Sequence, residues 1–280
     1  MDRIPDWTAE LDTPVPEPQA ATGPLRWTAR GEHELPTTDA WLAPAESARA
    51  AGMRFTKRRT EYLLRRWAGK QAVAAAAGLP TDVGGLARIE VANRPGGAPY
   101  VVVGGAPLRL DVSLTDRAGW AVCVVGADLS RVGCDLELVE PRSAAFVADF
   151  LTAGEQEYVA ACPSHQRDAV VNLVWSAKES ALKVLRTGLR RDTRSVDVLL
   201  GRDDDIDAAG ALADAGTGWH PLTVRPAEGG ALPGWWRRDG AFLLTVAADR
   251  PLPVPEVLRG SADLTRADPR HSWVDRPLAP

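Results

Sequence analysis

The stretch "VGCDLEL", Val132 to Leu138, has the alternation of a β-strand with one apolar and one acidic face. Side chains of a strand point alternately to its two sides, so Asp135 and Glu137 share one face, and the cysteine and leucines share the other. Like charges at this spacing repel unless solvent or a cation screens them. The pair is therefore either a solvated strand face or a site for a hard cation such as Mg2+, which binds carboxylates and phosphate oxygens. Gly133 would let a ligand approach the backbone.

A second charged motif, "WSAKESALK" from Trp175 to Lys183, has helical spacing about forty residues later. On a helix, Trp175, Glu179 and Lys183 line one stripe, and Lys178 lies about 100° round from Glu179. An exposed Glu-Lys pair worth about 0.3–0.5 kcal/mol, with the tryptophan in the core, would explain this helix alone. Together, the strand and this helix offer three oxygen ligands, Asp135, Glu137 and Glu179, with Lys183 beside them for a phosphate. Such a group suits a diphosphate held by a metal.

Around these motifs the chain alternates between helical and strand-like patterns. Helical spacing covers residues 45–77, 146–162 and 166–185, and Gly78 and Pro80 end the first. Strand patterns cover residues 86–91, 100–103, 119–128, 131–139, 194–200, 220–226 and 241–249. We expect 119–128 and 131–139 to form a hairpin. Helix then sheet, twice over, predicts an α+β fold of two similar halves, although no residue-level repeat is visible.

The expected organisation has four parts. Residues 1–25 form an extended N-terminal arm and residues 251–280 a Pro-rich C-terminal tail, each packed on the core or mobile. Residues 26–128 form the first half and residues 129–250 the second. Within the second half, residues 201–216 indicate an acidic loop.

Composition limits the function classes. The chain has 280 residues, of which 45% are hydrophobic, enough for the core of a globular protein. Its net charge of −4 argues against a dedicated nucleic-acid binder. Neither a signal peptide nor an apolar run of about 18 residues is present, so we expect a cytoplasmic protein without a membrane partner. The three cysteines stand among apolar residues and are expected to be buried thiols. Four histidines without ligand spacing argue against a transition-metal site.

The charged motifs together resemble the 4′-phosphopantetheinyl transferases of the surfactin-synthetase-activating type. That family has a G-x-D-x-E strand, a W-x-x-K-E-x-x-x-K helix about forty residues later, and a short segment before the first. In this chain they are "GCDLE" (133–137), "WSAKESALK" (175–183) and "SLTDRAGW" (113–120). The resemblance spans residues 45–250 and implies two pseudo-symmetric α+β halves with the active site in the cleft between them.

The resemblance also implies the reaction. The 4′-phosphopantetheine arm of coenzyme A would pass to a serine of an acyl or peptidyl carrier protein, as in a holo-[acyl-carrier-protein] synthase, releasing 3′,5′-ADP. Asp135, Glu137 and Glu179 would bind Mg2+ or Mn2+, and Lys183 would contact phosphate. Glu179 or Lys178 would take the serine proton, and the motifs leave this choice open. The chain's length suits the monomeric branch of the family, which serves polyketide or nonribosomal peptide synthases.

A basic segment and the short segment complete the implied coenzyme A site. Residues 54–70 contain seven basic residues and one acid, either as a solvated helix face or as partners of the 3′-phosphate. Arg58 and Arg66 match the family's basic helix best, with Lys57 and Lys70 beside them. The loop "GGAPY" (96–100) resembles the family's adenine loop. The short segment adds Thr115, Asp116 and Arg117.

The short segment also departs from the family, which has a histidine where this chain has Asp116. A carboxylate cannot contact a phosphate without a proton or cation between them. Asp116 must therefore point away, pair with Arg117 or reach the metal, and we expect Arg117 to take over the phosphate contact. Two alternatives to the transferase stay open: a non-catalytic member that binds carriers or coenzyme A, and a metal-dependent phosphoester hydrolase.

Overall fold

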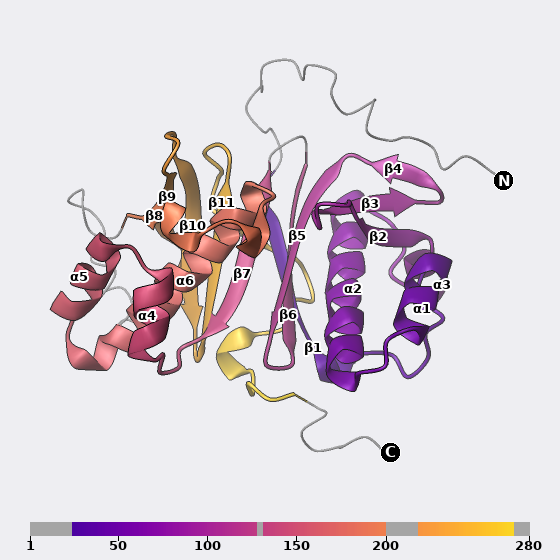
Figure 1. Ribbon diagram of the computed structural model, residues 1–280. Helices are drawn as coiled ribbons and strands as arrows, with labels where there is room; N and C mark the ends of the chain where they lie inside the picture. Colours follow the sequence, from indigo (N-terminus) through magenta and orange to yellow (C-terminus); the bar gives the residue numbers. More distant parts are fainter. Residues whose placement is uncertain (1–23, 128–130, 200–217, 272–280) are drawn as a thin grey trace.

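The computed structural model describes residues 24–127, 131–199 and 218–271. It has mixed α+β architecture, in which two sheets lie side by side with a long helix packed on each (Figure 1). The expected acidic loop at 201–216 lies outside the described residues. Among the described residues, no helix is both long and apolar enough to cross a membrane.

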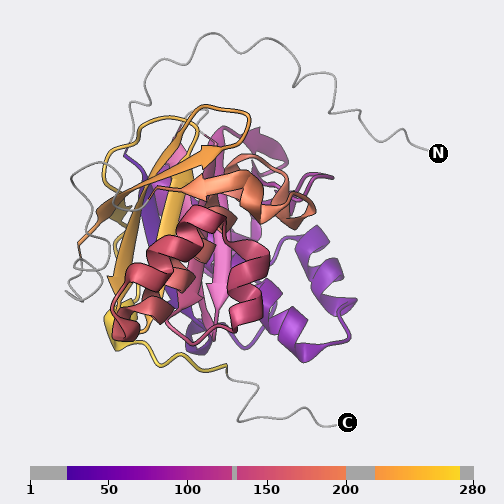
Figure 2. The same cartoon turned by 60° about the vertical axis from the view of Figure 1, so that its left-hand side comes forward.

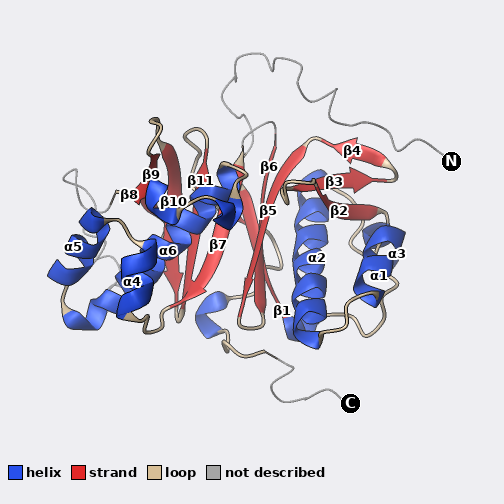
Figure 3. Ribbon diagram, in the orientation of Figure 1, coloured by secondary structure: helices blue, strands red, loops and turns tan. Residues whose placement is uncertain are grey.

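The first part of the chain forms two sheets. One is four-stranded, of order β12-β1-β6-β5, and includes β12 from the C-terminal segment; the other is three-stranded, of order β2-β3-β4. Helix α2 covers the four-stranded sheet (Figure 3). The strands are β1 Arg26–Gly31, β2 Ile89–Asn93, β3 Pro99–Val103, β4 Ala106–Leu108, β5 Leu110–Arg117, β6 Trp120–Ala127 and β12 Glu256–Val257, and the helices are α1 Pro44–Ala51, α2 Thr56–Ala77 and α3 Val83–Ala87.

The second part forms a five-stranded sheet of order β7-β11-β10-β9-β8. Helices α4 to α6 lie in front of this sheet in Figure 2, and α6 packs directly on β7 and β11. The strands are β7 Val132–Leu138, β8 Val196–Val198, β9 His220–Pro226, β10 Leu232–Asp239 and β11 Phe242–Ala248, and the helices are α4 Ala144–Phe150, α5 Ala153–Ala161 and α6 Arg167–Val184.

Three predicted elements need correction. The helical pattern at 146–162 is two helices, α4 and α5, because Leu151 and Thr152 between them are extended. The helical pattern at 45–77 is interrupted after Gly52, so α1 and α2 are separate helices. The expected hairpin between 119–128 and 131–139 is wrong, because β6 pairs with β1 and β5 on its two edges while β7 pairs with β11. Hydroxyl groups connect the two sheets instead. Ser113 Oγ accepts from Cys134 N at 2.9 Å, and Thr115 Oγ1 accepts from Leu136 N at 3.2 Å.

Each long helix is tied to its own part of the chain by a buried ion pair. Lys70 Nζ lies 2.5 Å from Glu46 Oε2, and Lys178 Nζ lies 2.9 Å from Glu155 Oε2, with both lysine side chains fully buried. Each glutamate also accepts an N–H at the start of its own helix and another from a strand residue. These donors are Ala43 and Val91 for Glu46, and Thr152 and Val198 for Glu155.

This shared network reveals a repeat that the sequence analysis did not find. The lysine follows a tryptophan by three residues in both helices, as Trp67 with Lys70 and as Trp175 with Lys178. Both lysines also donate to two backbone carbonyls of their own part of the chain. The same side-chain pattern therefore fastens α2 and α6 to their surroundings.

The described part of the C-terminal segment packs against the protein. β12 pairs in parallel with β1, and Leu258 and Leu264 are buried in two different hydrophobic clusters. Trp120 Nε1 donates to Asp268 O at 2.7 Å, and a side chain at Gly119 would collide with Arg270 O. Up to residue 271 this segment therefore contributes to the core.

Candidate active site

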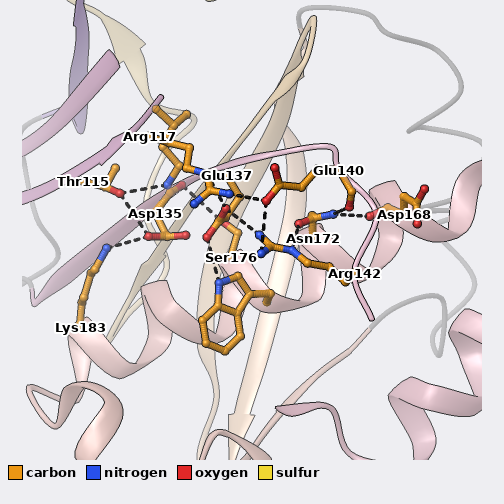
Figure 4. Close-up of polar contacts among 12 residues, drawn as sticks. Thr115, Arg117, Asp135, Glu137, Glu140, Arg142, Asp168, Asn172, Ser176 and Lys183 are labelled. Atoms are coloured by element: carbon orange, nitrogen blue, oxygen red, sulfur yellow. Dashed lines mark hydrogen bonds and ion pairs between the residues drawn. The ribbon is translucent and has the colours of Figure 1, made fainter. Parts of the chain in front are cut away.

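The site lies where β7, α6 and β5 meet. Cys134 and Leu136 are buried in the core, whereas Asp135 and Glu137 point to the opposite face, as the alternation predicts (Figure 4). Gly133 does not face a ligand. A Cβ at this position would lie 2.0 Å from Ser180 O, so the glycine allows α6 to pack closely on β7.

Asp135 is the central acid of the site. It is 6% exposed, and its Oδ1 accepts from Thr115 Oγ1 at 3.2 Å and from Lys183 Nζ at 2.9 Å. Its Oδ2 is shielded from solvent and has no hydrogen-bond partner among the described residues. A buried carboxylate oxygen without a partner is costly, which identifies it as a position for a cation or a proton.

Lys183 is held beside this acid. Its Nζ also donates to Cys134 O at 2.7 Å. Burial lowers the pKa of Lys183, but the charge of Asp135 and the hydrogen bond to it raise that pKa more, so the net shift is upward. The lysine therefore stays cationic at neutral pH, with its charge fixed next to Asp135.

Glu179 lies on the same stripe of α6, one turn before Lys183. The pKa of Glu179 is raised to about 7, first by burial and then by the charges of Asp135 and Glu137, while Lys183 acts in the opposite direction. An acid whose pKa lies near neutrality can accept and release a proton under physiological conditions. The mutual effect of these charges also shows that the three acids share one electrostatic environment.

Glu137 is engaged by cations and an indole. Its Oε2 lies 3.0 Å from an Arg142 nitrogen and 3.3 Å from Arg117 Nε, and its Oε1 accepts from Trp175 Nε1 at 3.0 Å. Both arginines also pair with Glu140. Burial and the charge of Asp135 raise the pKa of Glu137, and the two arginines act against them.

The acids of this site, Asp135, Glu137 and Glu179, are the candidates for holding a metal ion. In the described parts of the chain, no three histidine, cysteine or acidic side chains are grouped closely enough to do so as they stand. The reason at this site is that Glu137 is turned toward Arg117 and Arg142. Asp135 and Glu179 still offer two carboxylates and one free oxygen, and Mg2+ commonly uses one or two carboxylates with water and substrate phosphates. The donor set therefore fits Mg2+.

The short segment on β5 differs from the expectation. Asp116 does not pair with Arg117 or face the metal ligands; it pairs with Arg65 of α2. Alternation along β5 explains this, because Thr115 and Arg117 point toward β7 and Asp116 points to the other face. Arg117 pairs with Glu137 and Glu140. Its contact with phosphate stays a prediction.

Three other predicted residues lie away from the acids. The structure contradicts Lys178 as the base, because this lysine points to a different side of α6 from Glu179 and is buried against Glu155. Lys70 is equally enclosed by Glu46, and Arg66 is 5% exposed and donates to Val91 O, so neither is free for a phosphate. Helical periodicity could have shown this, since each residue falls on the core-facing side of its helix.

The remaining predicted phosphate ligands are at the start of α2. Lys57 Nζ lies 3.9 Å from Glu61 Oε1, with the lysine side chain 61% exposed. The Arg58 guanidinium lies 5.9 Å from the ring centroid of Phe55, an aromatic side chain that is itself exposed. These two cations are accessible, and nothing in their contacts assigns them a ligand.

The sequence analysis missed three charged residues that organise the site: Arg65, Glu140 and Arg142. Arg142 also donates from Nε to Asn172 Oδ1 at 2.7 Å, which joins the loop after β7 to α6. The only signal in the sequence was the proximity of Glu140 and Arg142 to the acidic strand. The pairing of Arg65 with Asp116 joins residues 51 positions apart and had no local signal.

The fold is mixed α+β, and an acidic strand packs on a helix that bears glutamate and lysine, an arrangement that suits phosphate-containing groups. The family model of the 4′-phosphopantetheinyl transferase superfamily matches residues 131–224, which include β7, α6 and most of β9. This match, which covers a third of the chain, supports membership in the 4′-phosphopantetheinyl transferase superfamily. No curated protein matches the chain in sequence.

Proposed function

We propose that the protein transfers the 4′-phosphopantetheine arm of coenzyme A to a serine of an acyl or peptidyl carrier protein, using Mg2+ or Mn2+. The observation that carries this proposal is the partnerless Oδ2 of Asp135, placed beside Glu179 and Lys183. Membership in the superfamily supports phosphopantetheine transfer in general. The carrier as acceptor, the metal and the individual residues are part of the proposal.

Asp135 and Glu179 would hold the metal ion, and Glu137 would join them if Arg117 and Arg142 released it. The ion supplies charge neutralisation for the diphosphate of coenzyme A. Lys183 is in position to neutralise the same phosphates, because its charge is fixed 2.9 Å from Asp135 Oδ1. Positioning and charge neutralisation of this kind account for most of the catalysis in phosphoryl transfer.

Glu179 is the base that the geometry favours. The serine oxygen would form a new bond to the phosphorus that bears the pantetheine arm, and the bond from that phosphorus to the 3′,5′-ADP oxygen would break. The serine proton would pass to Glu179, whose pKa of about 7 suits proton transfer near neutral pH. Lys178 cannot take this role, since its Nζ is enclosed by Glu155 and two backbone carbonyls.

Intact-mass measurement tests the proposal. Purified protein with coenzyme A, Mg2+ and an apo carrier should add the mass of the arm to the carrier. Glu179→Gln should abolish the gain, whereas Glu157→Gln, at an exposed position of α5, should leave it unchanged. Failure to modify any of several acyl and peptidyl carriers would refute the transfer activity.

A non-catalytic member of the family is the second candidate, favoured by the pairing of Asp116 with Arg65 where the family has a histidine. It predicts coenzyme A binding in calorimetry without transfer. In that case Asp116→His should restore transfer, because it replaces the anion with the family's phosphate-binding side chain. Transfer by the unaltered protein would exclude this candidate.

A further inference from the structure

The end of α6 carries an arginine at a position where helices favour glycine. Thr187 N donates to Leu182 O and Arg186 N donates to Lys183 O, both at 3.1 Å, which is the Schellman pattern of helix termination. Arg186 occupies the left-handed position of this motif, with φ of 57°. A side chain there is strained, so its presence suggests a use for the arginine.

The residues after α6 line an open cavity of about 390 Å3, formed by Arg186, Thr187, Arg190 and Arg191. Arg191 pairs with Glu228. For Arg186 and Arg190, no ion pair is found within the described ranges. The hydroxyl oxygen of Thr187 is shielded from solvent and also lacks a described partner. The cavity therefore combines two cations that lack a described ion pair with an unsatisfied hydroxyl, a combination that suits an anion.

Neighbouring charged residues also act electrostatically on Arg186. Burial lowers the pKa of Arg186, and the charges of Arg131 and Arg94 lower it too, while Asp111 and Asp249 act in the opposite direction. Arg94 lies over the ring of Tyr100, with 5.3 Å between guanidinium and ring centroid, and its Nε is shielded without a described partner. Burial also raises the pKa of Asp111. The three arginines, Arg94, Arg131 and Arg186, thus outnumber the two aspartates that act on this place.

We propose that Arg186, Thr187 and Arg190 form a binding site for a phosphate monoester or free phosphate, separate from the Asp135 centre. Arginine and hydroxyl donors match the oxygens of such a dianion. Arg186 follows Lys183 by three residues, just past the end of α6. One ligand with two phosphate groups could reach both.

Two sources of the anion share this chemistry: the 3′-phosphate of coenzyme A, which rests on the proposed function, and inorganic phosphate, which does not. The first source would move the expected 3′-phosphate contact from α2 to the end of α6. The enclosed position of Arg66 supports that change.

Calorimetry on the full-length, metal-free protein distinguishes these sources without requiring turnover. We expect 3′,5′-ADP to bind about tenfold or more tightly than 5′-AMP, and Arg186→Gly to remove this preference while leaving 5′-AMP binding unchanged. Arg190→Gln should reduce the preference as well. The matched control is Arg194→Gln, because Arg194 is an exposed arginine already paired with Asp192.

The variant Arg186→Gly also separates binding from folding. Since glycine adopts the left-handed conformation without strain, the thermal midpoint should rise by about 2–4 °C as binding is lost. If the nucleotides bind equally but titrated inorganic phosphate binds in an Arg186-dependent way, the site holds free phosphate. If neither binding depends on Arg186, the site is refuted. Arg186-dependent binding without carrier modification would leave the site standing and remove the transferase proposal.

Discussion

The ionisation of Glu179 should weaken the metal-free protein above neutral pH. Its folded-state pKa is about 7, compared with 4.5 for the free side chain. Because folding raises this pKa, the contribution of Glu179 to stability is fully present below about pH 4.5 and is lost as the pH rises through 7. The difference of 7 − 4.5 = 2.5 pKa units corresponds to about 3 kcal/mol at about 1.4 kcal/mol per unit.

The variant Glu179→Gln isolates this effect. Glutamine keeps the size of the side chain but carries no charge at any pH, and the other titrating groups are common to both proteins. Urea unfolding in the presence of a chelator should give similar free energies of unfolding at pH 5. At pH 8, Glu179→Gln should be more stable than the unaltered protein by up to about 3 kcal/mol. Equal stability at both pH values, or a less stable variant at pH 8, would show that the carboxylate is not destabilised by its surroundings.

The addition of Mg2+ provides the complementary measurement. An ion bound by Asp135 and Glu179 stabilises the folded state by mass action and favours the ionised form of both acids. The thermal midpoint of the unaltered protein should therefore rise with Mg2+ more at pH 8 than at pH 5. Glu179→Gln should show little change. Equal Mg2+ responses in the two proteins would remove Glu179 from the metal site.

Three further predictions concern packing and charge. Lys178→Met leaves Glu155 buried without its partner and should cost about 3–5 kcal/mol in urea unfolding, which adding Glu155→Leu should partly recover; a loss under 1 kcal/mol would contradict the structural role. Gly133→Ala places a Cβ 2.0 Å from Ser180 O, so it should cost about 1–3 kcal/mol, and an unchanged midpoint would disprove the close packing of α6. Arg117→Gln removes a cation that competes for a metal ligand, so less Mg2+ should be needed for half of the thermal shift, and a higher requirement would contradict that competition.

The parts of the site that were predictable from sequence depend on local periodicity. Alternation along β7 placed Asp135 and Glu137 on one face, and the 3.6-residue period of α6 placed Glu179 and Lys183 on one stripe. The partner of β7 was not predictable in this way. Adjacent strands usually pair, but β6 already has partners on both edges, so β7 pairs with the distant β11.

The partners of the buried lysines show a second limit. A lysine in a helical motif is usually interpreted as a surface residue, because burying its charge without a partner is unfavourable. Lys70 and Lys178 are buried because each finds a glutamate from another helix and two backbone carbonyls. Their partners lie 23 or 24 residues earlier in the sequence, so no helical period connects them.

The repeated helix pattern explains why the acidic centre forms beside α6 and not beside α2. With Trp67 matched to Trp175, Gln71 takes the place of Glu179 and Ala75 takes the place of Lys183. The first helix therefore keeps the lysine that fastens it to its surroundings but lacks the carboxylate and the cation of the proposed centre. Its contribution to the shared region is Arg65, which pairs with Asp116 on β5. In α6 the buried Lys178 and the proposed catalytic Glu179 are adjacent residues. Of these two positions, only that of the lysine is common to both helices, as Lys70 and Lys178.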